Sequence, residues 1–84
     1  MSRDEIFRVL TDNILKVLPD VKADMVRPDR QLKELGANSI DRMDIVMGTI
    51  EDLRIKVPVT ELGTAKDIGS LLAVLERYGT TGPR

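Results

Sequence analysis

Apolar residues recur at spacings of three and four positions in the first part of the chain. The recurring residues are Ile6, Val9, Leu10, Ile14, Val17 and Leu18. This spacing places them on one face of a helix. Ser2 and Glu5 form a capping-box pattern, in which the Ser2 hydroxyl accepts from the Glu5 amide and Glu5 reaches back. Because Pro19 disfavours helical geometry at the preceding residue, we predict a helix over residues 3–18.

Residues 19–38 show no sustained period and contain two prolines. A connection of this length is unusual in a small domain unless it is functional or packs on itself. Four apolar residues are available to anchor it to the core: Val21, Val26, Leu32 and Leu35. Residues 32–35 fit one helical turn that Gly36 closes. We therefore expect an ordered crossover loop.

Three further helical segments follow the loop. Asn38, with Asp41 three positions later, is typical of a helix start and predicts a helix over residues 39–53. Val57-Pro58 ends any continuation, and residues 60–62 fit a short turn closed by Gly63.

The last helix has a start signal at Thr64 to Asp67 and a C-terminal cap at Gly79. Its apolar face consists of Ile68, Leu71, Leu72, Leu75 and Tyr78. Residues 79–84 are expected to form a flexible tail. No alternating strand pattern occurs. The predicted fold is all-α, a small four-helix bundle with a long loop between helices 1 and 2 and a short third helix.

Size and composition narrow the chemistry. The 84 residues predict a single domain, residues 1–84, and the capping box directly after Met1 favours a free-standing protein. The chain has no cysteine and no histidine. It therefore lacks disulfides, thiolate metal sites and the commonest general base and metal ligand. We expect no catalytic residue and no metal.

The charge and aromatic content also exclude classes of partner. The chain carries 13 basic and 14 acidic residues, for a net charge of −1, and only two aromatic side chains, one Tyr and one Phe. The chain therefore lacks the excess of basic residues that nucleic-acid binding needs, and it has few side chains that could stack on bases. No apolar run is long enough for a membrane span, and the N-terminus has no signal core. We expect a cytoplasmic monomer that binds neither nucleic acid nor membrane.

The segment 39–53 has an unusual distribution of side chains around its axis. Most of its apolar residues fall in one arc of about 140°; they are Ile40, Met43, Val46, Met47, Ile50 and Leu53. Ile45 lies outside this arc. One side carries Asp41, Asp44, Glu51 and Asp52. With Arg42 as the only basic residue, the local charge is −3.

Two interpretations of this segment compete. The acidic side is a solvated face of an ordinary bundle helix, or it is part of a partner surface. If Ile45 and Val46 face the core together with Leu53, then Ile40, Met43 and Met47 border the acidic side at the surface. An apolar patch containing Met and rimmed by like charges is typical of a protein-binding surface.

Ser39 stands at the start of this segment and allows three roles. It can cap the helix, which is the commonest job of Ser at this position. As a nucleophile it needs a base, and only Lys33 is conceivable. As a modification site it is well placed, because the positive end of a helix stabilises an attached phosphate.

The sequence around Ser39 resembles the signature of acyl carrier proteins. The matching run is Leu32-x-x-Leu35-Gly36-Ala37-Asn38-Ser39-Ile40-Asp41, and the order of elements matches over the whole chain. The resemblance implies that a phosphopantetheinyl transferase attaches 4′-phosphopantetheine from coenzyme A to Ser39. The arm's thiol would then carry acyl groups as thioesters, while partner enzymes supply the catalysis.

The resemblance also maps the family's recognition helix onto residues 39–53. Its acidic positions fall on Asp41, Asp44 and Glu51, and its apolar contacts fall on Ile40, Met43 and Met47. Two departures stand out, since Asn38 replaces the usual Asp and Arg42 adds a positive charge. With the mild net charge, they favour a specialised pathway over fatty-acid synthesis.

Residues 35–42 and 61–69 look like the free-standing donor carriers of polyketide β-branching cassettes. In those systems malonyl on the arm is decarboxylated to acetyl, which an enzyme similar to hydroxymethylglutaryl-CoA synthase adds to a β-keto intermediate. The implied partners are this synthase-like enzyme, an acyltransferase and a ketosynthase-type decarboxylase. A fatty-acid or peptidyl carrier and an unmodified helical adaptor remain as alternatives.

Overall fold

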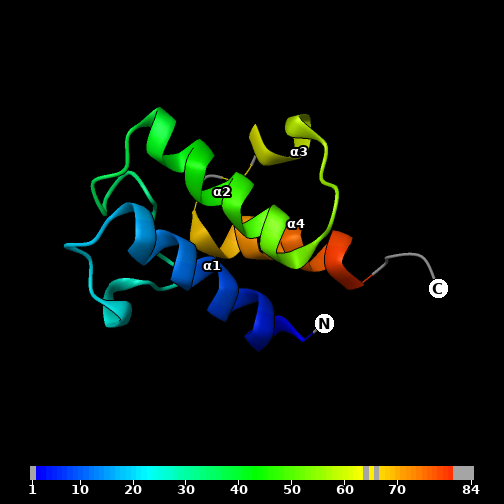
Figure 1. Cartoon of the computed structure of the whole chain (residues 1–84), viewed down its shortest axis with the longest axis horizontal. Helices are drawn as coiled ribbons and strands as arrows, with labels where there is room; N and C mark the ends of the chain where they lie inside the picture. The colour runs from blue at the N-terminus through cyan, green and yellow to red at the C-terminus, as the bar shows by residue number, and fades with distance from the viewer. Residues whose placement is uncertain (1, 64, 66, 81–84) are drawn as a thin grey trace.

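The computed structural model describes residues 2–63, residue 65 and residues 67–80. The described residues contain helices and turns but no strand, which confirms the predicted all-α class. The elements are α1 (Arg3–Val17), the 3₁₀ turn η1 (Ala23–Met25), α2 (Ser39–Leu53), α3 (Val59–Gly63) and α4 (Ile68–Thr80). Figure 1 shows α1 and α2 side by side, α2 passing in front of α4, and the short α3 at one edge.

Local capping explains both ends of α1. The Ser2 hydroxyl accepts from the Glu5 amide at 3.2 Å, as its sequence predicts. The helix ends at Val17, one residue before the predicted end, although the Leu18 amide still donates to the Ile14 carbonyl at 2.8 Å.

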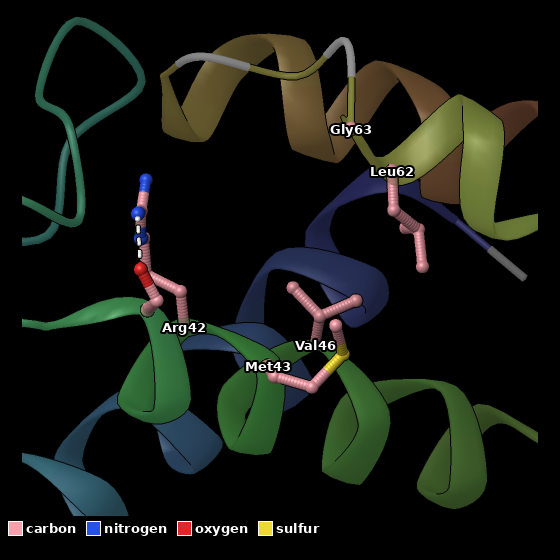
Figure 2. A pocket seen from close by; sticks show the side chains of 6 residues that line it. Arg42, Met43, Val46, Leu62 and Gly63 are labelled. Atoms are coloured by element: carbon pink, nitrogen blue, oxygen red, sulfur yellow. Dashed lines mark hydrogen bonds between the residues drawn. The ribbon is translucent and has the colours of Figure 1, made fainter.

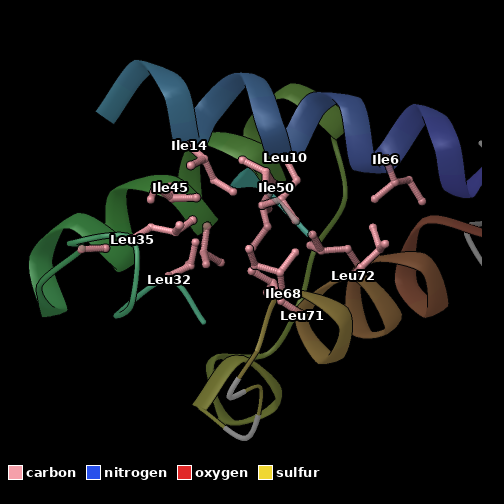
Figure 3. Packing of buried hydrophobic residues seen from close by; sticks show 14 of the residues in the cluster. Ile6, Leu10, Ile14, Leu32, Leu35, Ile45, Ile50, Ile68, Leu71 and Leu72 are labelled. Atoms are coloured by element: carbon pink, nitrogen blue, oxygen red, sulfur yellow. The ribbon is translucent and has the colours of Figure 1, made fainter. Parts of the chain in front are cut away.

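The core forms where the apolar faces of three helices meet (Figure 3). Among the described residues, seven hydrophobic side chains are at least 98% buried: Ile6, Leu10, Ile14, Ile45, Ile68, Leu72 and Leu75. The predicted faces of α1 and α4 supply six of them. Since α1 packs against both α2 and α4, these two helices are held at fixed positions around it. The short α3 packs against α4.

A close approach between α1 and α2 occurs at Asn13 and Gly48. The Asn13 side chain is buried, and its Nδ2 donates to the Val9 carbonyl at 2.9 Å and to Asp52 Oδ2 at 3.0 Å. A Cβ on Gly48 would collide with Asn13 Oδ1. The exposed Asp52 on the acidic side of α2 therefore also bonds to α1.

The long connection between α1 and α2 is ordered, as expected. All four predicted anchors are buried. Its last turn ends in a Schellman motif: the Ala37 amide donates to the Leu32 carbonyl and the Gly36 amide to the Lys33 carbonyl, both at 3.1 Å. Gly36 has φ +100°, which a residue without a side chain adopts at little cost. The short turn η1 was not predicted.

Two backbone hydrogen bonds tie this loop to the start of α4. The Ile68 amide donates to the Arg30 carbonyl and the Gly69 amide to the Pro28 carbonyl, each at 2.8 Å. A Cβ on Gly69 would lie 3.0 Å from the Pro28 oxygen, so the loop passes unusually close to the helix.

The ends of α4 differ from the sequence prediction. The helix begins at Ile68, and Asp67 Oδ1 accepts from the Ser70 amide at 2.7 Å, so Asp67 is the cap. Thr64, where the start signal was expected to begin, lies outside the described residues. Gly79 was expected to end the helix, but α4 continues through it to Thr80. Of the predicted tail 79–84, residues 81–84 lie outside the described residues.

Candidate functional site

The start of α2 is held by a reciprocal capping box. The Asp41 amide donates to Asn38 Oδ1 at 2.7 Å, and the Asn38 amide donates to Asp41 Oδ2 at 3.2 Å. Asn38 is thus the N-cap, and Ser39 is the first residue of the helix. The interpretation of Ser39 as the cap is therefore wrong, because the Asn38 side chain caps the helix.

The Ser39 hydroxyl is exposed and has one hydrogen-bond partner among the described residues. Arg42 Nη2 donates to Ser39 Oγ at 3.3 Å. A guanidinium stays protonated in proteins and cannot remove a proton from the hydroxyl. The Lys33 side chain is exposed and makes no hydrogen bond to Ser39. In the described part of the chain, therefore, no base activates this serine as a nucleophile.

An open groove of about 330 Å³ runs between α2 and α3 beside Ser39. Its lining residues are Ser39, Arg42, Met43, Val46, Leu62 and Gly63. Figure 2 shows the Arg42 guanidinium reaching out from α2 at one end of the groove, and the apolar side chains of Val46 and Leu62 further along it.

The sequence did not predict this groove, because Leu62 and Gly63 belong to a helix of five residues that shows no periodicity of its own. The Ser39–Arg42 contact was also missed. Their spacing of three positions on a helix was the available signal.

The outer face of α2 carries three exposed large apolar side chains. Ile40 is 73% exposed, Met43 50% and Met47 44%. Ile45, Val46, Ile50 and Leu53 are buried. The apolar residues of α2 thus divide between core and surface. The sequence predicted Ile40, Met43 and Met47 at the surface if the other apolar residues of α2 faced the core, and the structure has this arrangement.

The acidic residues of α2 have different surroundings. Asp44 and Glu51 are exposed and form no hydrogen bond or ion pair with any described residue. Asp41 is engaged by the Asn38 amide and Asp52 by Asn13. The free negative charge therefore lies at Asp44 and Glu51, on the helix that presents the exposed apolar residues.

The described residues contain neither a metal-binding cluster nor a membrane-spanning helix. No cluster of acidic, Cys or His side chains there is arranged to hold a metal ion. No helix in that part of the chain has the length and apolarity needed to cross a membrane.

Comparison with known proteins identifies the family. Residues 8–75, which include all of α2 and α3, match the family described as "Phosphopantetheine attachment site". The chain belongs to the acyl carrier protein family. The cofactor of this carrier protein is covalently attached 4′-phosphopantetheine, and proteins of the family generally carry cargo without catalysing reactions.

Two curated relatives cover nearly the whole carrier protein. It is 45% identical over 75 residues to the "Polyketide biosynthesis acyl-carrier-protein AcpK" of Bacillus subtilis (strain 168), which covers 89% of this chain and 92% of the relative. It is 26% identical over 76 residues to the "Acyl carrier protein" of Thermotoga maritima, with 90% and 94% covered. No solved structure gave a significant match.

Proposed function

We propose that Ser39 carries the 4′-phosphopantetheine arm and that the protein holds acyl groups on it for a polyketide pathway. The observation that carries this proposal is that Asn38, and not Ser39, caps the start of α2. Asn38 caps the helix, so the neighbouring hydroxyl is exposed and free of a structural task. When bound, the arm supplies the thiol that this cysteine-free chain lacks.

The surroundings of Ser39 fit a phosphate ester. The hydroxyl lies in the first turn of α2, where the helix dipole and backbone amides stabilise negative charge. The Arg42 guanidinium lies within hydrogen-bond distance of the same oxygen. A transferase would join Oγ to the phosphorus of coenzyme A that bears pantetheine, and 3′,5′-adenosine bisphosphate would leave.

The other two serines of the chain are poorer candidates. Ser2 uses its hydroxyl to cap α1. Ser70 lies in the first turn of α4, and its side chain and amide both bond to the Asp67 carboxylate. Among the described serines, Ser39 is the one whose hydroxyl accepts a hydrogen bond from a cationic side chain.

Within polyketide biosynthesis we favour the role of acetyl donor in β-branching. The relative with 45% identity supports a polyketide pathway by its name. The donor role rests on the runs 35–42 and 61–69. Its cargo would be malonyl, decarboxylated to acetyl. Its partners would be an acyltransferase, a ketosynthase-type decarboxylase and an enzyme similar to hydroxymethylglutaryl-CoA synthase.

The partner surface of this proposal is the outer face of α2. Ile40, Met43 and Met47 provide apolar contacts, and Asp44 and Glu51 attract a basic partner. Asp41 and Arg42 lie at the end of this surface nearest Ser39. The proposal places the protein in the cytoplasm, where coenzyme A is available, and as a monomer, so that this face stays open to successive enzymes.

The arm proposal is tested by incubating the protein with coenzyme A and a transferase of broad specificity. Intact mass is expected to rise by one phosphopantetheinyl group in the wild type and in Ser70→Ala, the matched control. Ser39→Ala should remain unmodified with an unchanged circular dichroism spectrum. A folded wild type that several transferases fail to modify, but that still binds partners through α2, would instead support an unmodified adaptor.

The donor role has a separate test. The malonyl-loaded protein is given the decarboxylase, then the synthase-like enzyme and a β-ketoacyl acceptor on a second carrier. Transfer of acetyl to the acceptor is expected, with an ordinary fatty-acid carrier at least about tenfold slower. Equal rates from both carriers would leave the arm proposal intact and remove the donor role.

A further inference from the structure

Arg42 is the one basic side chain on α2, and it lies beside the hydroxyl that we propose to be modified. We propose that Arg42 is a positioning residue whose guanidinium binds the phosphodiester at Ser39 and directs the start of the arm along the α2–α3 groove. This inference rests on the proposed function. It assigns Arg42 a role within the chain, in addition to any contact with partners.

The distance between the two side chains carries the first step. Arg42 Nη2 already lies 3.3 Å from Ser39 Oγ. In the ester, the anionic phosphoryl oxygens are separated from Oγ only by the phosphorus atom, so a guanidinium at this distance can reach them with little movement. Charged oxygens are stronger acceptors than an ester oxygen, and arginine can bind two of them at once. The existing contact would therefore become a pair of opposite charges.

The electrostatic surroundings of Arg42 carry the second step. Among the described residues, the ion pairs join Arg3 with Glu76 and Arg77 with Glu61, and none includes Arg42. The nearest acidic neighbour in the sequence, Asp41, is held by the Asn38 amide. The guanidinium is thus not committed to a carboxylate of its own chain and is available to an anion attached at Ser39.

The groove gives this pairing a consequence for the arm. Arg42 lies at the end where the arm would begin, and Val46 and Leu62 line the space beyond it (Figure 2). A volume of about 330 Å³ is in the range of small-molecule sites. Fixing the phosphate at this end favours arm conformations that pass over the apolar lining, and it leaves less of the arm free in solvent.

The experiment compares wild type, Arg42→Ala, Arg42→Lys and Arg8→Ala, each converted to the modified form and checked by intact mass. Arg8 is an exposed residue of α1, and its removal changes the net charge equally. The readouts are the phosphorus-31 chemical shift of the phosphodiester and the proton NOEs between the pantetheine methyls and Val46 or Leu62.

We expect the Arg42→Ala phosphorus shift to move toward that of the same phosphodiester in the urea-unfolded modified protein, and its NOEs to be lost. Arg8→Ala should match the wild type. Arg42→Lys should lie between them, because an ammonium is a point charge without the planar fork. If all four modified proteins give the same shift and the same NOEs, the role of Arg42 is wrong while the arm proposal stands. If the wild type gains no mass, it is the arm proposal itself that fails.

Discussion

At the scale of single residues, Asn38 and Ser39 show how adjacent polar side chains take separate tasks. The sequence predicted a cap at this point because Asn38 and Asp41 have the required local spacing. It left open whether Ser39 shared the cap, since Ser is equally suited to that role. Only the hydrogen bonds of the folded chain assign the cap to Asn38.

This assignment predicts opposite results for the two neighbouring substitutions. Asn38→Ala should lower the free energy of unfolding by about 1 kcal/mol, as expected for a lost N-cap. Ser39→Ala should change it by less than about 0.5 kcal/mol. Urea unfolding followed by circular dichroism measures both. A cost for Ser39→Ala as large as that for Asn38→Ala would contradict the assignment.

Gly48 gives a second prediction at this scale. An alanine usually stabilises a helix relative to glycine, but here its Cβ meets Asn13 Oδ1, and Asn13 is held by two hydrogen bonds. We expect Gly48→Ala to destabilise the protein by about 1–3 kcal/mol in urea unfolding. Gly63→Ala, where a Cβ has open space, is the control and should cost less. Equal effects would show that the α1–α2 contact tolerates the methyl group. The sequence could not predict this contact, because residues 13 and 48 meet only through tertiary packing.

At the scale of elements, local signals predicted α2 better than α4. The bounds of α2 follow from Asn38 at one end and the end of its apolar pattern at the other, and the structure reproduces residues 39–53. The start of α4 depends on the Pro28 and Arg30 carbonyls of a distant loop. Thr64 and Asp67 are both capping residue types. The local sequence could therefore not predict that Asp67 caps α4.

The Asp67 cap predicts a dependence of stability on pH. Hydrogen bonds from the Ser70 side chain and amide hold the pKa of the Asp67 carboxyl below its usual value of 3.8. The carboxylate therefore contributes stability above that value, and this contribution is lost as the pH falls through the lowered pKa. Asp67→Ala should be less stable than the wild type at pH 7, and the difference should narrow below about pH 4.

Thermal unfolding from pH 2 to pH 7 measures this difference. Asp12→Ala, which removes an exposed carboxyl on α1 that forms no hydrogen bond or ion pair with any described residue, is the control. A constant difference between wild type and Asp67→Ala across the range would contradict the prediction.

At the scale of the whole molecule, the sequence predicted the fold class and the exposed face of α2. More apolar residues lie on that helix than so small a core can bury, and Ile40, Met43 and Met47 are the ones left outside. The sequence grouped Asp52 with the other acidic residues of α2 but could not predict its hydrogen bond to α1, which forms only in the folded chain. The α2–α3 groove could not be predicted, because it depends on where the loop after α2 places a five-residue helix.

The charge on this face predicts how partners associate. Asp44→Lys and Glu51→Lys should each lower the association rate with a phosphopantetheinyl transferase by about tenfold at low salt, with a smaller effect at high salt. Stopped-flow kinetics at two ionic strengths measure this. Asp12→Lys, the same charge change on α1, should have little effect. If all three variants slow association equally, net charge and not the α2 face is responsible.

The central claim is that the Ser39 hydroxyl is the point of attachment. Its most direct test is tandem mass spectrometry of peptides from the protein after treatment with coenzyme A and a transferase. We predict one phosphopantetheinyl group, attached to the side chain of Ser39 in the peptide that contains it and absent from Ser2 and Ser70. An unmodified Ser39 in a folded protein, or a group located on either of the other serines, would contradict the account.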